Sequence, residues 1–281
     1  MLYASYRKYM FHQTLKLKIT FFLAALCLNL FADEIEPFGR LKNELESGHT
    51  MLGSIVTRRP RWIFDVVAGI HNNELGELYL GVWGASELSH KYNSQREQWF
   101  NEVDPRIGYA YKYGFCEGYA LTTRIEFQWS EMRYMNLPRT YTQWIATETL
   151  QTPYVDVYGF AWVVTHPYRA PAYRVGIKKD VPLWEKLSVE PHLYLDMGPE
   201  RWNRRRFGTW TERPSCYRSG PSAINFHLLL KYQVIDNLLL YAGVRQYDLI
   251  VDEIRRQKRA QNTRNAKTDM TYFVFGSVLS F

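Results

Sequence analysis

The chain has 281 residues, a formal net charge of +7, a hydrophobic content of 46% and a mean hydropathy of −0.35. After the N-terminus no apolar run approaches the ~20 residues of a membrane-spanning helix, so a helical membrane protein is excluded. A membrane β-barrel is not excluded, because its apolar residues alternate with polar ones and average out in any window. The 21 Tyr, 15 Phe and 9 Trp would suit such strands, and equally a sugar-binding β-sandwich.

The N-terminus predicts an export signal. Four Lys or Arg residues precede the apolar run 19–28, and the first acidic residue is Asp33. This order is typical of a secretory signal peptide, so we expect residues 1–32 to be removed by cleavage after Ala32. A lipid anchor on Cys27 is the competing hypothesis, but Leu26 stands where a small residue is wanted. Removing the signal lowers the net charge to +3, so the basic balance does not indicate a nucleic-acid partner.

Residues 33–48 are acidic and poorly periodic, and predict a tail or a short plug ahead of a β domain at 49–281. From residue 61 onward, apolar and polar residues alternate with the period of two that β-strands require. The polar stretch 252–267 is the best helix candidate, but it could not bury a face. Eleven strands are predicted near residues 61–71, 78–89, 102–112, 121–129, 142–149, 155–163, 173–178, 187–196, 223–234, 238–249 and 271–281, with a weak twelfth at 51–56.

The connections between these strands alternate in length. Short turns at one end and long loops at the other are typical of bacterial barrels, whereas a Greek-key sandwich has no reason to show them. We therefore predict an all-β fold, a closed antiparallel up-and-down transmembrane β-barrel of about 12 strands. Ten strands is the alternative if 142–149 proves irregular. The short connections lie near 72–75, 113–117, 150–154, 181–185 and 235–237, and the mostly long ones near 90–101, 131–141, 166–171, 198–220 and 250–270.

Four segments carry a resemblance to a known group of proteins. They are residues 78–86, 102–109, 232–244 and the alternating end 271–281, which stops on Phe281. With these strand and turn patterns the chain resembles uncharacterised outer-membrane β-barrels of Gram-negative bacteria. The resemblance implies an outer-membrane location, surrounding outer-membrane lipid, and a barrel-assembly machinery that reads the terminal aromatic. It implies no catalytic residue, and the weak first strand and the basic loop after residue 252 depart from the pattern.

The polar faces of the strands carry both charge signs in balance. These charges either pair and fill the interior, or line a narrow channel for small hydrophilic solutes. For the channel, the balance predicts weak ion selectivity. The lumen and constriction candidates are Asp65, Glu102, Asp104, Arg106, Lys112, Arg124, Glu126, Asp156, Arg174, Lys178, Glu190, His192, Asp196, Lys231 and Arg245.

An outer-membrane hydrolase is a third hypothesis, because Glu190, His192 and Asp196 share a strand face and could form an acid/base cluster. His192 is better explained as a hydrogen-bonding residue of the lumen. The sequence has no metal-ligand spacing, nucleophile elbow or phosphate loop. We therefore expect neither an enzyme nor a cofactor or metal.

Two of the long loops are basic. Their charge is either solvated or contacts lipopolysaccharide phosphates, which arginine binds well. Cys116 and Cys216 fall at opposite ends of the predicted barrel, beyond disulfide reach across ~30 Å of hydrocarbon. The lipopolysaccharide-contact candidates are Arg204, Arg205, Arg206, Arg255, Arg256 and Arg259.

Overall fold

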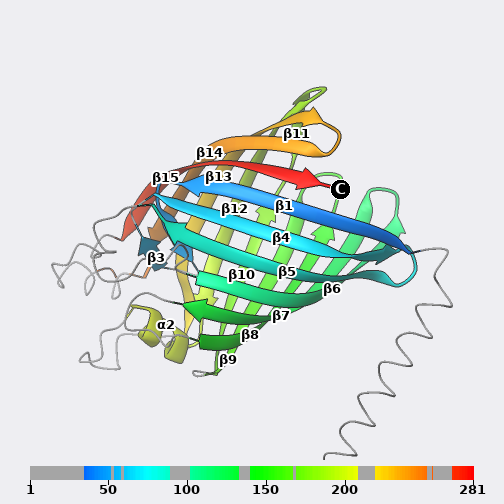
Figure 1. Cartoon of the computed structure of the whole chain (residues 1–281). Helices are drawn as coiled ribbons and strands as arrows, with labels where there is room; N and C mark the ends of the chain where they lie inside the picture. Colours follow the sequence, from blue (N-terminus) through cyan, green and yellow to red (C-terminus); the bar gives the residue numbers. More distant parts are fainter. Residues whose placement is uncertain are drawn as a thin grey trace, which may run out of the picture.

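The computed structural model describes residues 35–51, 54–57, 60–88, 102–132, 140–166, 169–207, 219–251, 255 and 268–281. Within them, 12 antiparallel strands close into a barrel (Figure 1), which confirms the predicted fold class. The barrel strands are β1 (Glu36–Glu46), β4 (Arg61–Asn72), β5 (Gly76–Glu87), β6 (Glu102–Cys116), β7 (Tyr119–Met132), β8 (Thr140–Gln151), β9 (Asp156–His166), β10 (Ala170–Lys178), β12 (Leu187–Gly198), β13 (Gly220–Ile235), β14 (Leu238–Leu249) and β15 (Asp269–Ser280).

Three short elements accompany the barrel. β11 (Val181–Trp184) pairs with the first residues of β12, beyond the part of β12 that pairs with β10. β2 (His49–Met51) and β3 (Ser54–Thr57) form a separate two-stranded sheet, and α2 (Glu200–Phe207) follows β12. No helix in the described segments is both long and apolar enough to cross a membrane.

The barrel closes where its first and last strands meet. β1 lies between β15 and β4, and it is in antiparallel register with both. Backbone hydrogen bonds from Gly39 N to Phe281 O (2.6 Å) and from Phe281 N to Gly39 O (3.0 Å) continue the pairing to the last residue. Because every strand then has two neighbours, no edge is left unpaired, as a sheet in lipid requires.

The sequence prediction for the first barrel strand was wrong. Residues 33–48 are not a tail or plug, because β1 occupies Glu36–Glu46, and the strand expected at 51–56 belongs instead to the β2–β3 hairpin outside the ring. β1 does alternate: Glu44 and Glu46 face inward while Leu41 and Leu45 flank them on the outer face. The predicted count of 12 strands is confirmed, but the twelfth strand is β1 and not residues 51–56. β8 is a regular strand, so the ten-stranded alternative is wrong.

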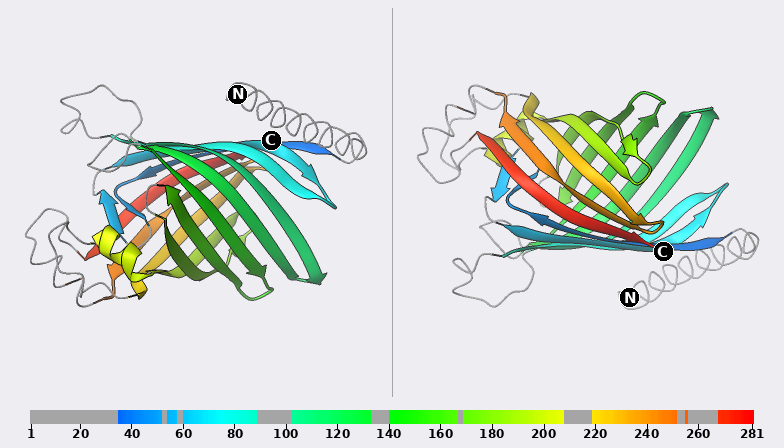
Figure 2. Two further views of the ribbon diagram at one scale, coloured as in Figure 1. Left: turned by 90° about the horizontal axis from the view of Figure 1, so that it is seen from below. Right: turned by 90° about the horizontal axis from the view of Figure 1, so that it is seen from above.

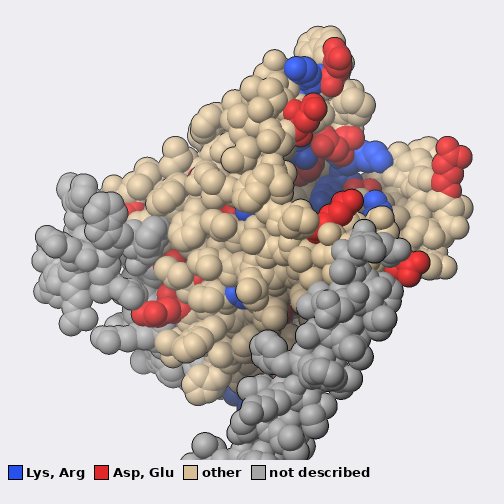
Figure 3. Space-filling model, turned by 45° about the vertical axis from the view of Figure 1, so that its right-hand side comes forward, with Lys and Arg blue, Asp and Glu red and all other residues tan. Residues whose placement is uncertain are grey.

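The outer face of the barrel is apolar and the inner face is polar. Leu80, Trp129 and Phe273 are 64%, 59% and 69% exposed, whereas Arg61 and Glu102 are each only 1% exposed. In the space-filling view most of the wall is uncharged, and Lys, Arg, Asp and Glu gather in a hollow at one end (Figure 3). This distribution is the reverse of that in a water-soluble domain and suits strands surrounded by lipid.

The two ends of the barrel differ as predicted. We call the end beside Phe281 the turn end, because the described connections there are short; one example is residues 236–237 between β13 and β14 (Figure 1). The turn before Gly76 is held by Asn72, whose side-chain oxygen accepts hydrogen bonds from the backbone N–H groups of Glu74 (2.9 Å) and Leu75 (2.8 Å). Gly76 itself has a φ of 83°, which a residue with a Cβ rarely adopts. Most of the connections at the opposite loop end lie outside the described residues.

Three tyrosines, spaced four strands apart around the ring, brace the inner wall in the same way. Each ring lies over a glycine of the next strand, and its hydroxyl bonds to a side chain one strand further on. A Cβ on these glycines would come within 2.3–2.6 Å of the ring, so only glycine leaves room. The three braces are Tyr79 over Gly108 to Glu126 (2.6 Å), Tyr158 over Gly176 to His192 (2.7 Å) and Tyr241 over Gly276 to Glu44 (2.6 Å).

We expect Gly108→Ala to destabilise the barrel by about 1–3 kcal/mol, the usual cost of overpacking. The new methyl would lie 2.3 Å from Cζ of Tyr79, so the ring must move and the bond to Glu126 must lengthen. The measurement is the free energy of unfolding of the refolded protein in urea. Gly159→Ala is the matched control, since a Cβ there meets nothing within 4 Å. An equal loss of unfolding free energy in the two variants would contradict a stabilising contact between Tyr79 and Gly108.

Candidate functional site

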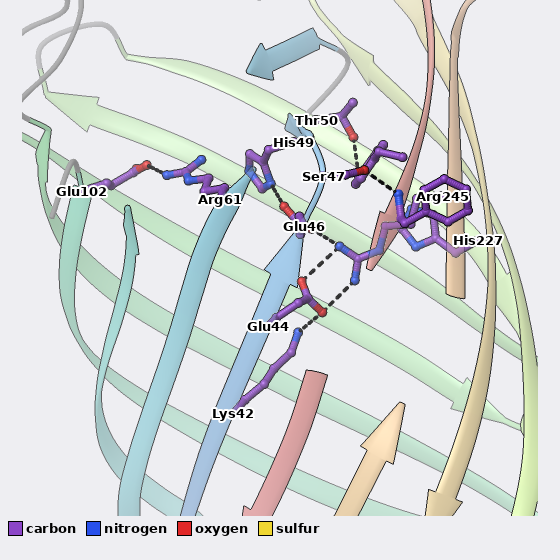
Figure 4. A network of polar contacts seen from close by, with 12 residues as sticks. Lys42, Glu44, Glu46, Ser47, His49, Thr50, Arg61, Glu102, His227 and Arg245 are labelled. Carbon is purple, nitrogen blue, oxygen red and sulfur yellow. Dashed lines mark hydrogen bonds and ion pairs between the residues drawn. The ribbon is translucent and has the colours of Figure 1, made fainter. Parts of the chain in front are cut away.

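The densest polar network in the interior joins β14 to β1 (Figure 4). The Arg245 guanidinium donates to both oxygens of Glu44, at 3.1 and 3.0 Å, and also to Glu46. Lys42 Nζ lies 3.1 Å from Glu44, and His49 Nδ1 lies 2.6 Å from the second oxygen of Glu46. One guanidinium from the last third of the chain therefore anchors two carboxylates of the first strand.

Both of these carboxylates are taken out of water. Glu44 is 3% exposed and Glu46 is 2% exposed. A buried charge is tolerated only when a well-oriented partner compensates its lost hydration. The two-pronged geometry of arginine on Glu44 supplies that compensation, so this network fixes β1 in the ring.

A second network lies across β4, β6 and β8. Arg61 and Glu102 form an ion pair of 3.1 Å, and the hydroxyl of Tyr141 donates to the other oxygen of Glu102 at 2.9 Å. Arg106 contacts Asp65 on β4 and approaches Glu126 on β7. Each of these acids is compensated by a cation or a hydroxyl from another strand.

A third network combines an ion pair with aromatic rings on β9, β12 and β13. Arg174 Nε donates to Asp196 at 2.7 Å, and its guanidinium lies 3.9 Å from the centre of the Tyr194 ring. The Tyr194 hydroxyl is 3.0 Å from Nε2 of His227, and the Tyr158 hydroxyl is 2.7 Å from Nε2 of His192. The two imidazoles are 5.2 Å apart, so polar aromatic groups line this part of the inner wall.

Nearer the turn end, charges on the inner wall are paired less completely. Lys231 binds Glu190 and reaches Asp180 at 3.1 Å. Among the described residues, no acid lies within ion-pair distance of Lys112, Arg124 or Lys178, and no cation within that distance of Asp156. By strand register, Lys178 lies opposite both Asp156 and His192 on the inner face. The wall is therefore charged but incompletely neutralised at this level.

The loop end is filled on one side by an apolar cluster. Trp202 of α2 is 6% exposed, and its ring packs edge-on against Trp162 at 5.6 Å. Figure 2 shows α2 and the β2–β3 hairpin at the same end of the barrel, and Thr50 of that hairpin is hydrogen-bonded to Tyr272 at 2.9 Å. Both elements narrow the interior at the loop end. The cluster comprises Tyr141, Trp162, Val164, Ala170, Ala172 and Trp202.

All the lumen residues expected from the sequence lie on inner faces of the strands. The structure divides them among the three networks and the turn-end group, except Asp104, which is buried in the wall opposite Trp83. Sequence analysis missed Glu44, Glu46 and Arg61, although these three are among the most buried charges of the wall. The alternation of Glu44 and Glu46 with Leu45 was the available signal for two of them.

The postulated acid/base cluster is not assembled as a unit. Glu190 binds Lys231, His192 bonds to the Tyr158 hydroxyl, and Asp196 binds Arg174. The described segments also contain no group of three or more His, Cys, Asp or Glu residues placed to hold a metal ion. Each member is therefore explained by its own partner in the wall.

The predicted lipopolysaccharide contacts are only partly visible. Arg255 donates to Asp248 and to the backbone oxygen of Leu249, so its guanidinium is already engaged. The side chains of Arg204, Arg205 and Arg206, and the whole of Arg256 and Arg259, lie outside the described residues. Cys116 is exposed and free, while Cys216 and the predicted signal peptide also lie outside the described residues.

No family model matches the chain, and no curated protein matches it. Among solved structures, it is similar to the KdgM porin, with a TM-score of 0.48 and 9% identity over 87% of this chain and 99% of that one. An outer membrane channel from Pseudomonas putida F1 has a TM-score of 0.48 and 10% identity, over 87% and 95% of the two chains. Pseudomonas putida OprB has a TM-score of 0.40 and 8% identity, over 90% and 96%.

The class of protein is defined by the chain's own features. It is a closed barrel of 12 antiparallel strands with an apolar outer wall, a charged inner wall and one end narrowed by a helix and a hairpin.

Proposed function

We propose that this chain is an outer-membrane protein whose barrel is a narrow passive channel for small hydrophilic solutes. The observation that carries the proposal is the placement of charge. Ionisable side chains gather inside a closed, apolar-walled ring, and a charged hollow opens at the turn end (Figure 3). Ionised groups on the inner wall stabilise water inside the barrel, although the outer wall is apolar. Hydrated solutes can then diffuse through this water.

The export signal predicted from the sequence at 1–32 and the exposed terminal aromatic support the proposed location. Phe281 is 72% exposed and continues the outer face of β15 at the turn end. We infer that the barrel-assembly machinery recognises this residue, and that lipid of the outer membrane surrounds the strands. Because Glu190, His192 and Asp196 are each engaged by a separate partner in the wall, the proposal includes no enzyme activity.

The proposal is tested by planar-bilayer recording from the refolded mature chain. We expect stable unitary conductance steps from protein that also resists SDS and shifts in mobility on boiling. The mobility shift is the control for folding, because an unfolded chain can also disturb a bilayer. A fully folded barrel that remains silent would reject the channel.

A closed structural or adhesion barrel is the second candidate. It is favoured by the apolar cluster around Trp202 and by the pairing of most inner charges, both of which fill space. In this case the basic loops would supply the activity by contacting lipopolysaccharide phosphates through Arg204, Arg205, Arg206, Arg255, Arg256 and Arg259. Silent bilayers combined with tighter binding to vesicles that contain lipopolysaccharide than to phospholipid vesicles would favour it.

A further inference from the structure

One acid on the outer wall of the barrel lies away from the loop end. Among the described residues, the outward positions of the barrel strands hold no Lys or Arg, and their acids are Glu131, Glu148, Asp248 and Asp269. Three of these lie within one residue of a strand terminus at the loop end. Glu148 instead follows Trp144 and Ala146 and precedes Leu150 on the outward face of β8. Its carboxylate therefore lies in an otherwise apolar part of the wall.

Glu148 is exposed on this wall and only half satisfied. Thr123 of β7 is its register partner, and the Thr123 hydroxyl donates to Oε2 at 2.7 Å. In the described part of the chain, no cation lies within ion-pair distance of Glu148 and no donor reaches its other oxygen. A carboxylate that faces lipid is costly without such a partner, and ionisable residues in this setting commonly have a binding role.

The position of Glu148 along the strand places it near the lipid headgroups. Thr152 begins the turn after β8, so the strand between Glu148 and the turn spans about 13 Å, or about 10 Å along the barrel axis at the ~40° tilt of such strands. Tyr154 on that turn is 82% exposed, as is typical of the aromatic belt at a membrane interface. A headgroup in the leaflet at the turn end can therefore reach Glu148.

Small residues lie beside the carboxylate on the outer wall. Strand register places Gly159 of β9 next to Glu148, and Ala161 next to Ala146. A Cβ on Gly159 would meet nothing within 4 Å, so the space over it is open. We call Ala146, Gly159 and Ala161 the small-residue strip; it runs from Glu148 toward the loop end, deeper into the apolar band. The larger residues on its two sides are Ile125 of β7 and Val175 of β10, each 45% exposed.

The partner that Glu148 lacks is a cation that donates hydrogen bonds. A second copy of this chain could not supply one through the same wall, because its described outward positions hold no Lys or Arg. A primary ammonium group carries three N–H donors and a positive charge. An amine-bearing phospholipid joins such a group to acyl chains, and so matches both the carboxylate and the apolar strip beside it.

We propose that Glu148 and the small-residue strip bind a phospholipid with a primary ammonium headgroup, such as phosphatidylethanolamine, in the leaflet at the turn end. The inference rests on the proposed outer-membrane location and goes beyond the channel function. The ammonium donates a charge-assisted hydrogen bond to the second oxygen of Glu148, while Thr123 holds the first. One acyl chain lies over the strip between Ile125 and Val175.

The test is lipid retention, measured by native mass spectrometry. The mature chain is refolded into vesicles that contain equal amounts of phosphatidylethanolamine and phosphatidylcholine with identical acyl chains, and is then extracted into detergent. We expect each barrel to retain phosphatidylethanolamine several-fold more often than phosphatidylcholine, whose quaternary headgroup has no N–H donor. Glu148→Gln should abolish this preference, because the neutral amide no longer attracts the ammonium group.

Glu131→Gln is the matched control. It removes an outward acid at the loop end, so the lipid preference should not change. Gly159→Leu is a second variant that keeps Glu148 but fills the open space over the strip, and it should lower the retention of phosphatidylethanolamine several-fold. The mobility shift on boiling shows that each variant is folded.

Equal retention of the two lipids, or an unchanged preference in Glu148→Gln, would overturn the lipid site. A dimer of the chain that retains no lipid and is lost in Glu148→Gln would overturn it in favour of a second copy. Conductance of the same preparation separates this result from the proposed function. A conducting barrel without a lipid preference loses the site alone, whereas a folded, silent barrel that retains phosphatidylethanolamine loses the channel alone.

Discussion

Replacing Arg245 with methionine is expected to destabilise the barrel by about 3–5 kcal/mol, the usual cost of leaving a buried charge without its partner. Arg245 compensates Glu44 and Glu46, which are 3% and 2% exposed. Without the guanidinium, Glu44 would keep only Lys42 and the Tyr241 hydroxyl as partners, and Glu46 only His49, although both carboxylates stay buried. Because both are on β1, the loss should loosen the strand that closes the ring. The measurement is the free energy of unfolding in urea. The folded fraction at each urea concentration is read from the electrophoretic mobility, with a boiled sample as the unfolded reference.

Arg255→Met is the matched control, since its pair with Asp248 lies where the two side chains are 28% and 37% exposed. A pair of this kind contributes only ~0–1 kcal/mol. Adding Glu44→Gln and Glu46→Gln to Arg245→Met should recover much of the lost stability, because neutral amides no longer need the cation. Failure of that rescue would show that Arg245 acts through packing alone.

Replacing Trp202 with alanine is expected to release α2 from the barrel wall and raise the unitary conductance. Trp202 is 6% exposed against Trp162 and neighbouring alanines, and truncation of a buried tryptophan costs about 3–5 kcal/mol. An eight-residue helix cannot be stable in isolation, so the cost should appear as detachment of α2. The conductance of the variant, compared with that of the wild type, is the measurement.

Trp184→Ala controls for the loss of an indole. Trp184 is 73% exposed on β11 at the opposite end, so its removal should leave the conductance unchanged. An unchanged conductance in Trp202→Ala, with α2 shown to be detached by faster proteolysis, would mean that the helix does not narrow the pathway.

Alternation in the sequence was enough to predict eleven strands and the side of the wall to which their residues point. It succeeded because lipid and a charged lumen impose opposite requirements on the two faces, so the period of two is strong. β1 escaped detection because its outer face is interrupted by Pro37, Gly39 and Asn43, which leaves Leu41 and Leu45 as the apolar signal. Its many acids then suggested a solvated tail, although they are the buried partners of Arg245.

The pairings themselves could not be predicted. Whether Tyr79 meets Gly108, or Arg124 lacks an acid, depends on the stagger of neighbouring strands, which alternation does not encode. The same holds for Trp202, because nothing in the sequence of a long basic loop with four aromatic residues indicates which of them will pack against the barrel wall. Charge balance was visible in the sequence, but which charges pair with one another required the register.

The backbone hydrogen bonds between Gly39 and Phe281 complete the ring of strands. The ring could therefore form equally well from a chain that starts at a different strand. The start of β1 and Phe281 reach the same rim on adjacent strands, so a short peptide could join Glu36 to Phe281 and the chain could be opened at the two-residue turn 236–237. Such a circular permutant would begin on β14 and end on β13 while keeping every ladder of the ring. It would also separate the terminal aromatic from the chain terminus, and so show whether the cell recognises the residue or the end.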